Sequence, residues 1–182
     1  EAMPREQFLA ASTDTICDYI AGQITVDPLV LHEDQMTMEH AETKIDVTHR
    51  FEYGGSHDGR PVMVDGHLLK FHVPFSGDPN LWKARPSTFT LNPPRGDIDT
   101  RRQILTLTFA NTSQTEESWF KQQLESTLAS VRQSISAQLD QIQQYNTSVP
   151  RAVQEVVAHR REQLSKLHGL VSSFVIPLAK KL

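Results

Sequence analysis

A heptad-like repeat of apolar residues in the last third of the chain constrains the fold more than any other feature. The repeat follows Ser113 to Glu116, which match the S-x-x-E capping box of a helix N-terminus. Its apolar positions recur at alternating steps of three and four residues, the spacing of a helical seam. The seam consists of Leu124, Leu128, Val131, Ile135, Ile142, Tyr145, Val153, Val157, Arg160, Leu164, Leu167, Val171 and Phe174.

A break within this seam predicts two helices rather than one. Residues 146–148 are polar, and Pro150 suits the first turn of a new helix. Helices in water are stabilised mainly by burying such a stripe, so two helices joined by a short link should fold back as an antiparallel pair. We therefore predict a coiled-coil-like helical hairpin over residues 113–182. Within it, the seam residue Arg160 is expected to extend its charged end to solvent or to pair with Asp140 of the facing helix.

The middle of the chain has the alternation of a small antiparallel sheet. Residues 44–53 alternate with a period of two, with His49 among the apolar residues of one face, and a glycine-rich turn over residues 54–59 precedes a second extended stretch at 61–73. Residues 88–91 and 102–109 are expected to add further strands. Ahead of the sheet, residues 4–22 carry a loose apolar stripe that predicts a helix.

These patterns together predict an α+β fold. It comprises a small antiparallel β-sheet with an N-terminal helix, followed by a long antiparallel two-helix hairpin. We expect the β-rich half to span residues 1–112 and the hairpin residues 113–182, the two folding as one cooperative unit.

Composition narrows the classes of function. The net charge of −4 disfavours a general nucleic-acid partner. No apolar run approaches the roughly 18 residues of a membrane span. Cys17 is the only cysteine, which excludes an internal disulfide and a cysteine-based zinc site. We expect a small buried side chain at Cys17 and a cytoplasmic setting.

Chemistry-bearing residues do not form a recognisable catalytic or metal-binding motif. The chain has no G-x-S-x-G elbow and no phosphate-binding loop ending in G-K-S/T. His67 and His72 lie five residues apart on one expected strand and should point to opposite faces, so a shared metal ion is not expected. We predict no catalytic residue, no metal and no cofactor. A hydrolase that uses His67 or His72 with nearby acids remains an alternative.

A proline-stiffened loop over residues 74–94 offers a candidate ligand site. Aromatic and cationic side chains interleave along it, and Trp82, Lys83, Arg85 and Arg95 are the candidate contacts for a nucleotide-like anion. The opposing interpretation is that Trp82 packs down as a lid over the sheet core.

Two stretches carry a resemblance to a known family. The first comprises residues 71–78, 85–87 and 92–96, and the second comprises Tyr145, Asn146, Pro150, Arg160, Arg161 and residues 176–181. Together they resemble an uncharacterised accessory module of bacterial multidomain effector proteins, fused ahead of effector domains such as TIR. The resemblance implies a role in antiphage defence or a stress response, with the enzyme on a separate domain.

The sequence therefore predicts a non-catalytic module that scaffolds, oligomerises or senses a signal. Its expected partners are a second copy, another protein or a fused effector domain. The alternatives are a small-ligand receptor built on the loop at residues 74–94 and the histidine-dependent hydrolase.

Overall fold

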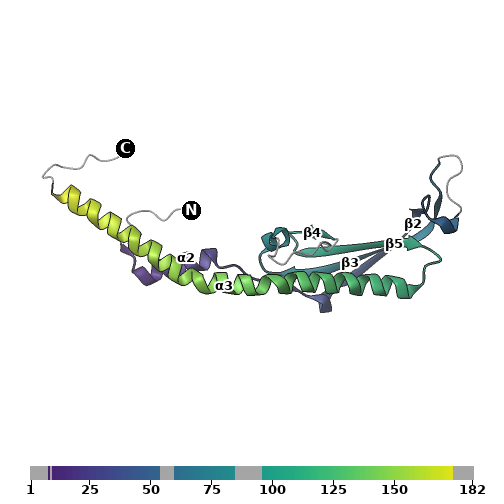
Figure 1. Ribbon diagram of the computed structural model, residues 1–182, viewed down its shortest axis with the longest axis horizontal. Helices are drawn as coiled ribbons and strands as arrows, with labels where there is room; N and C mark the ends of the chain where they lie inside the picture. The colour runs from purple at the N-terminus through teal and green to yellow at the C-terminus, as the bar shows by residue number, and fades with distance from the viewer. Residues whose placement is uncertain (1–7, 9, 54–59, 85–95, 174–182) are drawn as a thin grey trace. The chain divides into compact units, whose positions relative to one another are not determined.

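A computed structural model describes residue 8 and residues 10–53, 60–84 and 96–173 of the 182-residue chain (Figure 1). Helices and an antiparallel sheet are both present, which confirms the mixed α+β class. The chain forms two compact units, one of residues 1–26 with 142–182 and one of residues 27–141. This division differs from the boundary expected at residue 112.

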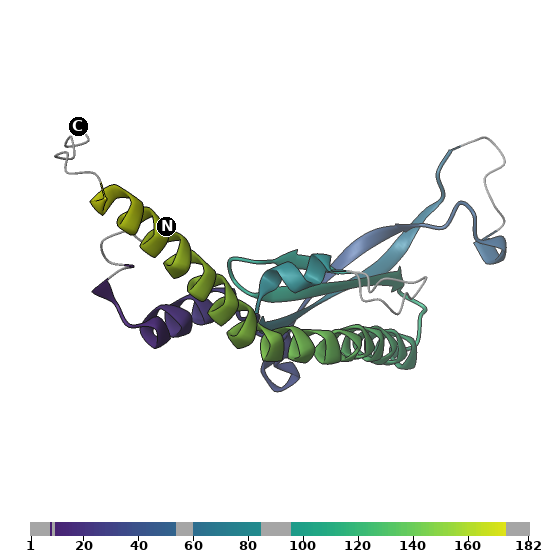
Figure 2. The ribbon, with the colours of Figure 1, turned by 60° about the vertical axis from the view of Figure 1, so that its left-hand side comes forward.

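The sheet belongs to the unit of residues 27–141, and all its pairings are antiparallel. Its strands are β1 (Val30–Leu31), β2 (Thr37–Asp46), β3 (Met63–Ser76), β4 (Asp97–Asp99) and β5 (Ile104–Thr112). The described residues between these strands include the 3₁₀ segments η1 (Glu33–Gln35), η2 (Phe51–Tyr53) and η3 (Pro79–Lys83). The long strand β3 is central, with β1 and β2 along one edge and β5, then β4, on the other. Figure 2 shows β2 and β3 as a long pair of strands.

The strand expected over residues 44–53 is wrong in its bounds, because β2 starts at Thr37 and ends at Asp46. The Asp46 carboxylate accepts hydrogen bonds from the backbone N–H and the hydroxyl of Thr48, which turns the chain out of the strand. Both bonds also lower the pKa of the Asp46 carboxyl, and the bond from the Thr48 hydroxyl has the larger effect. The strand expected over residues 88–91 and the turn over residues 54–59 lie outside the described residues.

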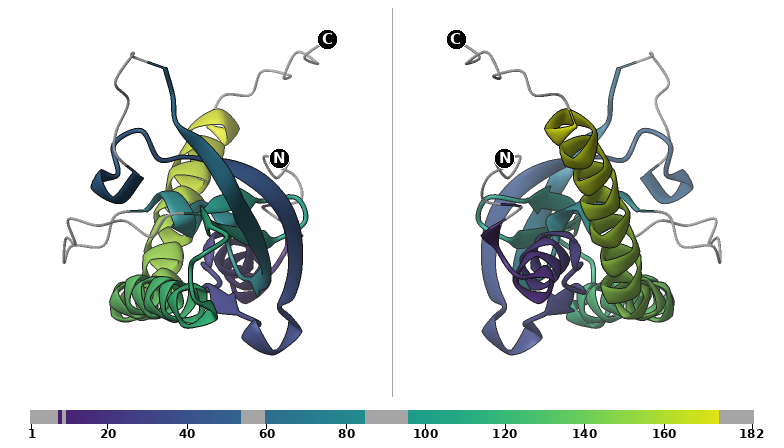
Figure 3. Two further views of the ribbon diagram at one scale, coloured as in Figure 1. Left: turned by 90° about the vertical axis from the view of Figure 1, so that its right-hand side faces the viewer. Right: turned by 90° about the vertical axis from the view of Figure 1, so that its left-hand side faces the viewer.

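One face of the sheet carries the core of this unit. Alternate residues of β3 and β5 point to the same face, and the register places Phe71 beside Leu107 and Val73 beside Leu105. The first part of α3 (Glu117–Ser172) runs along this face (Figures 1 and 3). The buried residues of this core cluster are Leu29, Phe71, Val73, Phe75, Leu105, Leu107, Leu128 and Val131.

The expected helical hairpin is wrong, because α3 is a single helix from Glu117 to Ser172 with Pro150 inside it. The hydroxyls of Thr147 and Ser148 donate to the backbone carbonyls of Gln143 and Tyr145, so both polar side chains are satisfied within the helix. Proline removes one backbone donor from the helix, a local loss that does not end it here. The expected facing of Arg160 and Asp140 disappears with the hairpin, and both side chains are exposed.

An antiparallel helix pair does exist, but α2 (Thr13–Ile24) supplies its other member. Ile16 and Cys17 of α2 form a buried cluster with Val149, Val153 and Val157 of α3. Cys17 is therefore the small buried side chain that we expected. The first described turn of α2 begins at Ser12, whose hydroxyl accepts from the backbone N–H of Thr15.

Polar contacts at both ends of α2 fix the direction of this pair. The side-chain amide of Asn146 accepts from the backbone N–H of Val26 at 3.0 Å and donates to the Val26 carbonyl at 2.9 Å. Near the other end, the Arg161 guanidinium donates to the carbonyls of Phe8 and Ala11. The chain order of these partners runs in opposite directions, so the two helices are antiparallel.

The expected seam thus divides between two partners. Its early residues Leu128 and Val131 are buried against the sheet, and Leu124 and Ile135 pack beside them. Its later residues Val153 and Val157 are buried against α2. Ile142 and Leu164 are also buried, whereas Tyr145, Arg160 and Leu167 are exposed. The side chain of Val171 and the residue Phe174 lie outside what the structure describes.

Gly77 ends β3 in a conformation that disfavours any other residue. Its φ is +100°, and a Cβ atom there would lie 2.2 Å from the backbone oxygen of Pro28. We expect Gly77→Ala to destabilise the chain by about 1–3 kcal/mol, because the strained φ and the backbone clash act together. Thermal unfolding measures the loss. Gly22→Ala is the matched control, since a Cβ at this helical position has open space around it, and a loss of stability there as large as at Gly77 would contradict the prediction.

Candidate functional site

Trp82 and Lys83, two of the four candidate ligand contacts, lie in η3. The Trp82 ring packs edge-on against Phe75 at a centroid distance of 5.3 Å and joins the rim of the sheet core. The Gln138 amide of α3 donates to the carbonyls of Leu81 and Ala84, which holds η3 against the helix. Trp82 therefore packs as the lid that the opposing interpretation expected. Arg85 and Arg95 lie outside the described residues, so the anion site stays a prediction.

His67 and His72 point to opposite faces of β3, as their spacing predicted. The Nδ1 atom of His72 lies 3.1 Å from the Thr106 hydroxyl, and its Nε2 atom lies 3.5 Å from the Glu39 carboxylate. A hydroxyl, an imidazole and a carboxylate thus lie in a row on the face of the sheet away from α3. Within the described ranges, no group of three or more His, Cys, Asp or Glu side chains could hold a metal ion.

In the part of the chain that the structure describes, the backbone around this row supplies no oxyanion hole of the kind that a hydrolase uses. Thr106 sits in the middle of β5, paired with His72 on one side and with Asp97 on the other. Backbone N–H groups in such a position are used by the strand ladders and cannot point at a developing oxyanion. The row therefore favours a structural network across the open face of the sheet.

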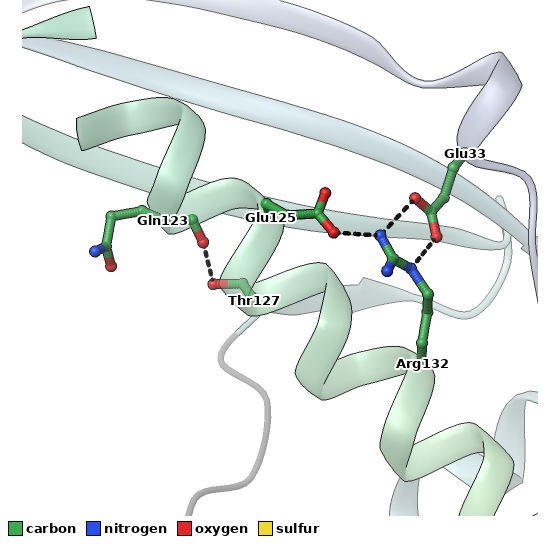
Figure 4. Close-up of polar contacts among 5 residues, drawn as sticks. All are labelled: Glu33, Gln123, Glu125, Thr127 and Arg132. Carbon is green, nitrogen blue, oxygen red and sulfur yellow. Dashed lines mark hydrogen bonds and ion pairs between the residues drawn. The ribbon is translucent and has the colours of Figure 1, made fainter. Parts of the chain in front are cut away.

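Arg132 of α3 forms ion pairs with two carboxylates, Glu33 and Glu125, and Figure 4 shows their geometry. Its Nε donates to Glu33 at 2.8 Å, and one terminal nitrogen donates both to Glu33 at 3.3 Å and to Glu125 at 3.0 Å. Both carboxylates raise the pKa of the Arg132 guanidinium, and Glu33 has the larger effect. Because Glu33 belongs to η1, just before β2, this contact fixes the start of β2 to the helix.

The outer side of β2 is a long, largely exposed edge of this sheet. All residues of β2 except Thr43 and Ile45 are exposed. β2 pairs with β3 along its whole length, and no other described strand pairs with it. A ten-residue strand with one unpaired side offers a row of backbone donors and acceptors to another strand.

The direction of each backbone group in β2 follows from one bond. The Val47 N–H donates to the Val62 carbonyl at 2.9 Å, just beyond the end of the β2–β3 ladder. In an antiparallel ladder the bonded residues alternate, so the odd-numbered residues of β2 turn their backbone groups toward β3. The N–H and C=O groups that point away from β3 belong to Met38, His40, Glu42, Lys44 and Asp46. We call these groups the outer edge of β2.

Side chains along the outer edge of β2 are mainly charged and share one face. Met38 lies beside Phe71, so the even-numbered side chains of β2 point to the α3 side of the sheet. Lys44 forms an ion pair of 2.5 Å with Asp65 directly opposite on β3. The neighbouring pair across the same two strands is Glu42 with His67.

Sequence reasoning missed this candidate site. The strand pattern that predicts β-structure needs one buried face, and residues 37–43 are polar or exposed on both faces. The only usable signal was the weak alternation of Met36 and Met38 ahead of the stronger pattern.

Comparisons with known proteins give no relative to argue from. No family model matches this chain, and no curated protein or solved structure matches it either. None of the helices within the described residues has an apolar stretch long enough to cross a membrane. The function must therefore be argued from the geometry of the chain.

Proposed function

We propose that this chain is a non-catalytic protein-interaction module, and that partners dock by adding a strand to the outer edge of β2. The observation that carries the proposal is the ten-residue length of β2 with one side unpaired in the described part of the chain. A partner strand gains main-chain hydrogen bonds along such an edge and gains specificity from the side chains that alternate along it.

Three large apolar side chains on or near the β2–β3 pair are exposed. Met38 is 56% exposed, Met63 is 48% exposed, and Phe51, which follows β2, is fully exposed. The expected helical seam no longer supports self-association, because most of its described apolar residues are used inside the two units.

The resemblance to accessory modules gives this proposal a setting. In that setting the chain is the scaffolding, oligomerising or sensing part of a bacterial effector, and the enzyme lies on another domain, such as a TIR domain. The reading frame of the parent gene tests this part directly. A parent that encodes no effector domain contradicts the setting but leaves the docking proposal intact.

A selection of peptides tests the docking proposal without a known partner. The chain is immobilised and a displayed library of ten-residue peptides is selected on it. Glu42→Pro is the blocking variant, because its outward N–H is lost and its ring obstructs a partner strand, while the bonds to β3 are kept. Glu42→Thr is the matched control, which keeps the N–H and removes the charge.

We expect peptides that bind the wild-type chain and the Glu42→Thr variant but not the Glu42→Pro variant. Circular dichroism should give similar melting temperatures for the two variants, because position 42 is exposed and its backbone groups point outward. Selected peptides that bind the Glu42→Pro variant equally well would rule out docking at this edge. A selection that enriches no peptide would also count against the proposal.

A further inference from the structure

The charges along the outer edge of β2 form a self-complementary series. Reading along the strand, the side chains on the α3 face are His40, Glu42, Lys44 and Asp46. Read in the opposite direction, the same series places an acid against each base and a base against each acid. An antiparallel copy of β2 centred on Thr43 would therefore pair His40 with Asp46 twice and Glu42 with Lys44 twice.

We propose that the partner of the outer edge of β2 is a second copy of this chain, paired antiparallel around a two-fold axis at Thr43. This inference rests on the proposed function, because it names the strand that docks there. Two β2 strands joined in this way continue each sheet into the sheet of the other copy.

Other registers around a two-fold axis pair like charges or lose the complementary pairs. An axis at Glu42 places two carboxylates opposite each other, and an axis at Lys44 does the same with two ammonium groups. An axis at Ala41 leaves Lys44 opposite Met38. Like charges directly opposite each other destabilise a strand pair, whereas unlike charges stabilise it. Thr43 is the centre that pairs Glu42 with Lys44 and His40 with Asp46, so each acid within residues 40–46 lies opposite a base.

Backbone geometry agrees with this register. All four residues of the series are among those whose N–H and C=O groups point outward, so they fall at hydrogen-bonded pairs between the two copies. Thr43 then falls at a non-hydrogen-bonded pair, where the two strands approach most closely and where threonine pairs are favourable.

The charge series also continues across the strands of each copy. Lys44 already pairs with Asp65 on β3, and Glu42 lies opposite His67. In the paired state a row of side chains would run from Asp65 to Lys44, then to Glu42 and His67 of the second copy. Charges on an edge strand commonly prevent unwanted pairing. Here their order opposes other registers and favours this one.

Single cysteines test both the pairing and its register. We expect Thr43→Cys to form a disulfide-linked dimer under mild oxidation, because a non-hydrogen-bonded pair brings the Cα atoms within the 4.4–6.8 Å that a disulfide needs. Ala41→Cys and Ile45→Cys should each give no disulfide-linked dimer alone, since four residues of strand separate the two copies of each cysteine. A mixture of these two variants should crosslink, because residues 41 and 45 lie opposite each other. The buried native Cys17 makes the unmodified chain the blank.

A charge exchange tests the electrostatic part in solution. Glu42→Lys alone and Lys44→Glu alone each place two like pairs in the dimer, and we expect the dissociation constant to rise about tenfold or more for each. An equimolar mixture of the two variants restores an unlike charge at every 42–44 pair. Light scattering should therefore find the mixture dimeric at concentrations where each variant alone is monomeric.

The outcomes separate this inference from the proposed function. A wild-type chain that stays monomeric at its highest soluble concentration, with no crosslink from Thr43→Cys, overturns the second copy as partner. Crosslinking by Ala41→Cys alone overturns the register. If peptides still bind the wild-type chain and fail on Glu42→Pro, only this inference has failed. If neither peptides nor a second copy bind, the proposed function fails with it.

Discussion

The substitution Val157→Asp is expected to detach α2 from α3. Val157 is 1% exposed and packs with Ile16 and Cys17 in the buried cluster of the unit of residues 1–26 with 142–182. An uncompensated charge buried in such a cluster costs about 3–5 kcal/mol. A unit whose described part is α2 and the second part of α3 has little other apolar contact to offset that loss.

Hydrogen exchange distinguishes this local effect from general unfolding. In Val157→Asp the amides of α2 should lose protection, while those of β3 and β5 should keep it. Both tryptophans of the chain, Trp82 and Trp119, belong to the unit of residues 27–141, so their fluorescence should change little. The matched control is Val156→Asp, since Val156 is 67% exposed on the same helix turn. Equal losses in the two variants would contradict the packing of α2 on α3.

The sequence predicted which helix faces are apolar but not what covers them. Periodicity marks Leu128, Val131, Val153 and Val157 as one stripe. The partners of that stripe are a sheet over its first part and α2 over its second part, and α2 lies at the other end of the chain. A helical hairpin was the simplest local way to bury the whole stripe. The loose apolar stripe of the N-terminal helix was the signal that another partner exists.

Long-range polar contacts explain why the expected break in α3 does not occur. Asn146 and Pro150 are ordinary signals for a helix end. In the folded chain, the Asn146 side chain instead satisfies both backbone groups of Val26, 120 residues away. Propensity is a weak prior, and such contacts override it. The ion pair of Arg132 with Glu33 could not be predicted from the sequence either, because no local spacing relates two residues that are 99 positions apart.

The sheet was easier to predict than the candidate site, and for one reason. Leu105 and Leu107 alternate with threonines, so the sequence alone indicates which face of β5 is buried. The outer edge of β2 is defined by backbone groups that have no partner strand, and hydropathy carries no information about them. Its charge series becomes meaningful only when the structure shows which residues turn outward.

Removing the side chain of Leu107 tests the core on which β2 and its edge depend. Leu107 of β5 is fully buried and lies opposite Phe71 of β3. It belongs to the cluster in which the sheet packs against α3. We expect Leu107→Ala to destabilise the unit of residues 27–141 by about 2–5 kcal/mol, because the lost apolar contacts add to the cost of a cavity. Chemical denaturation followed by tryptophan fluorescence measures this loss.

Leu139→Ala is the matched control for this prediction. Leu139 lies on α3 in the same unit but is 42% exposed, so the same truncation should change stability by no more than about 0.5 kcal/mol. A second readout combines Leu107→Ala with Thr43→Cys in one chain, at a concentration where the wild-type chain is half dimeric. In denaturant that begins to unfold the sheet, this double variant should form fewer crosslinks than Thr43→Cys alone. If Thr43→Cys still forms new crosslinks at denaturant concentrations where the tryptophan signal is lost, β2 does not need this core to stay paired with β3.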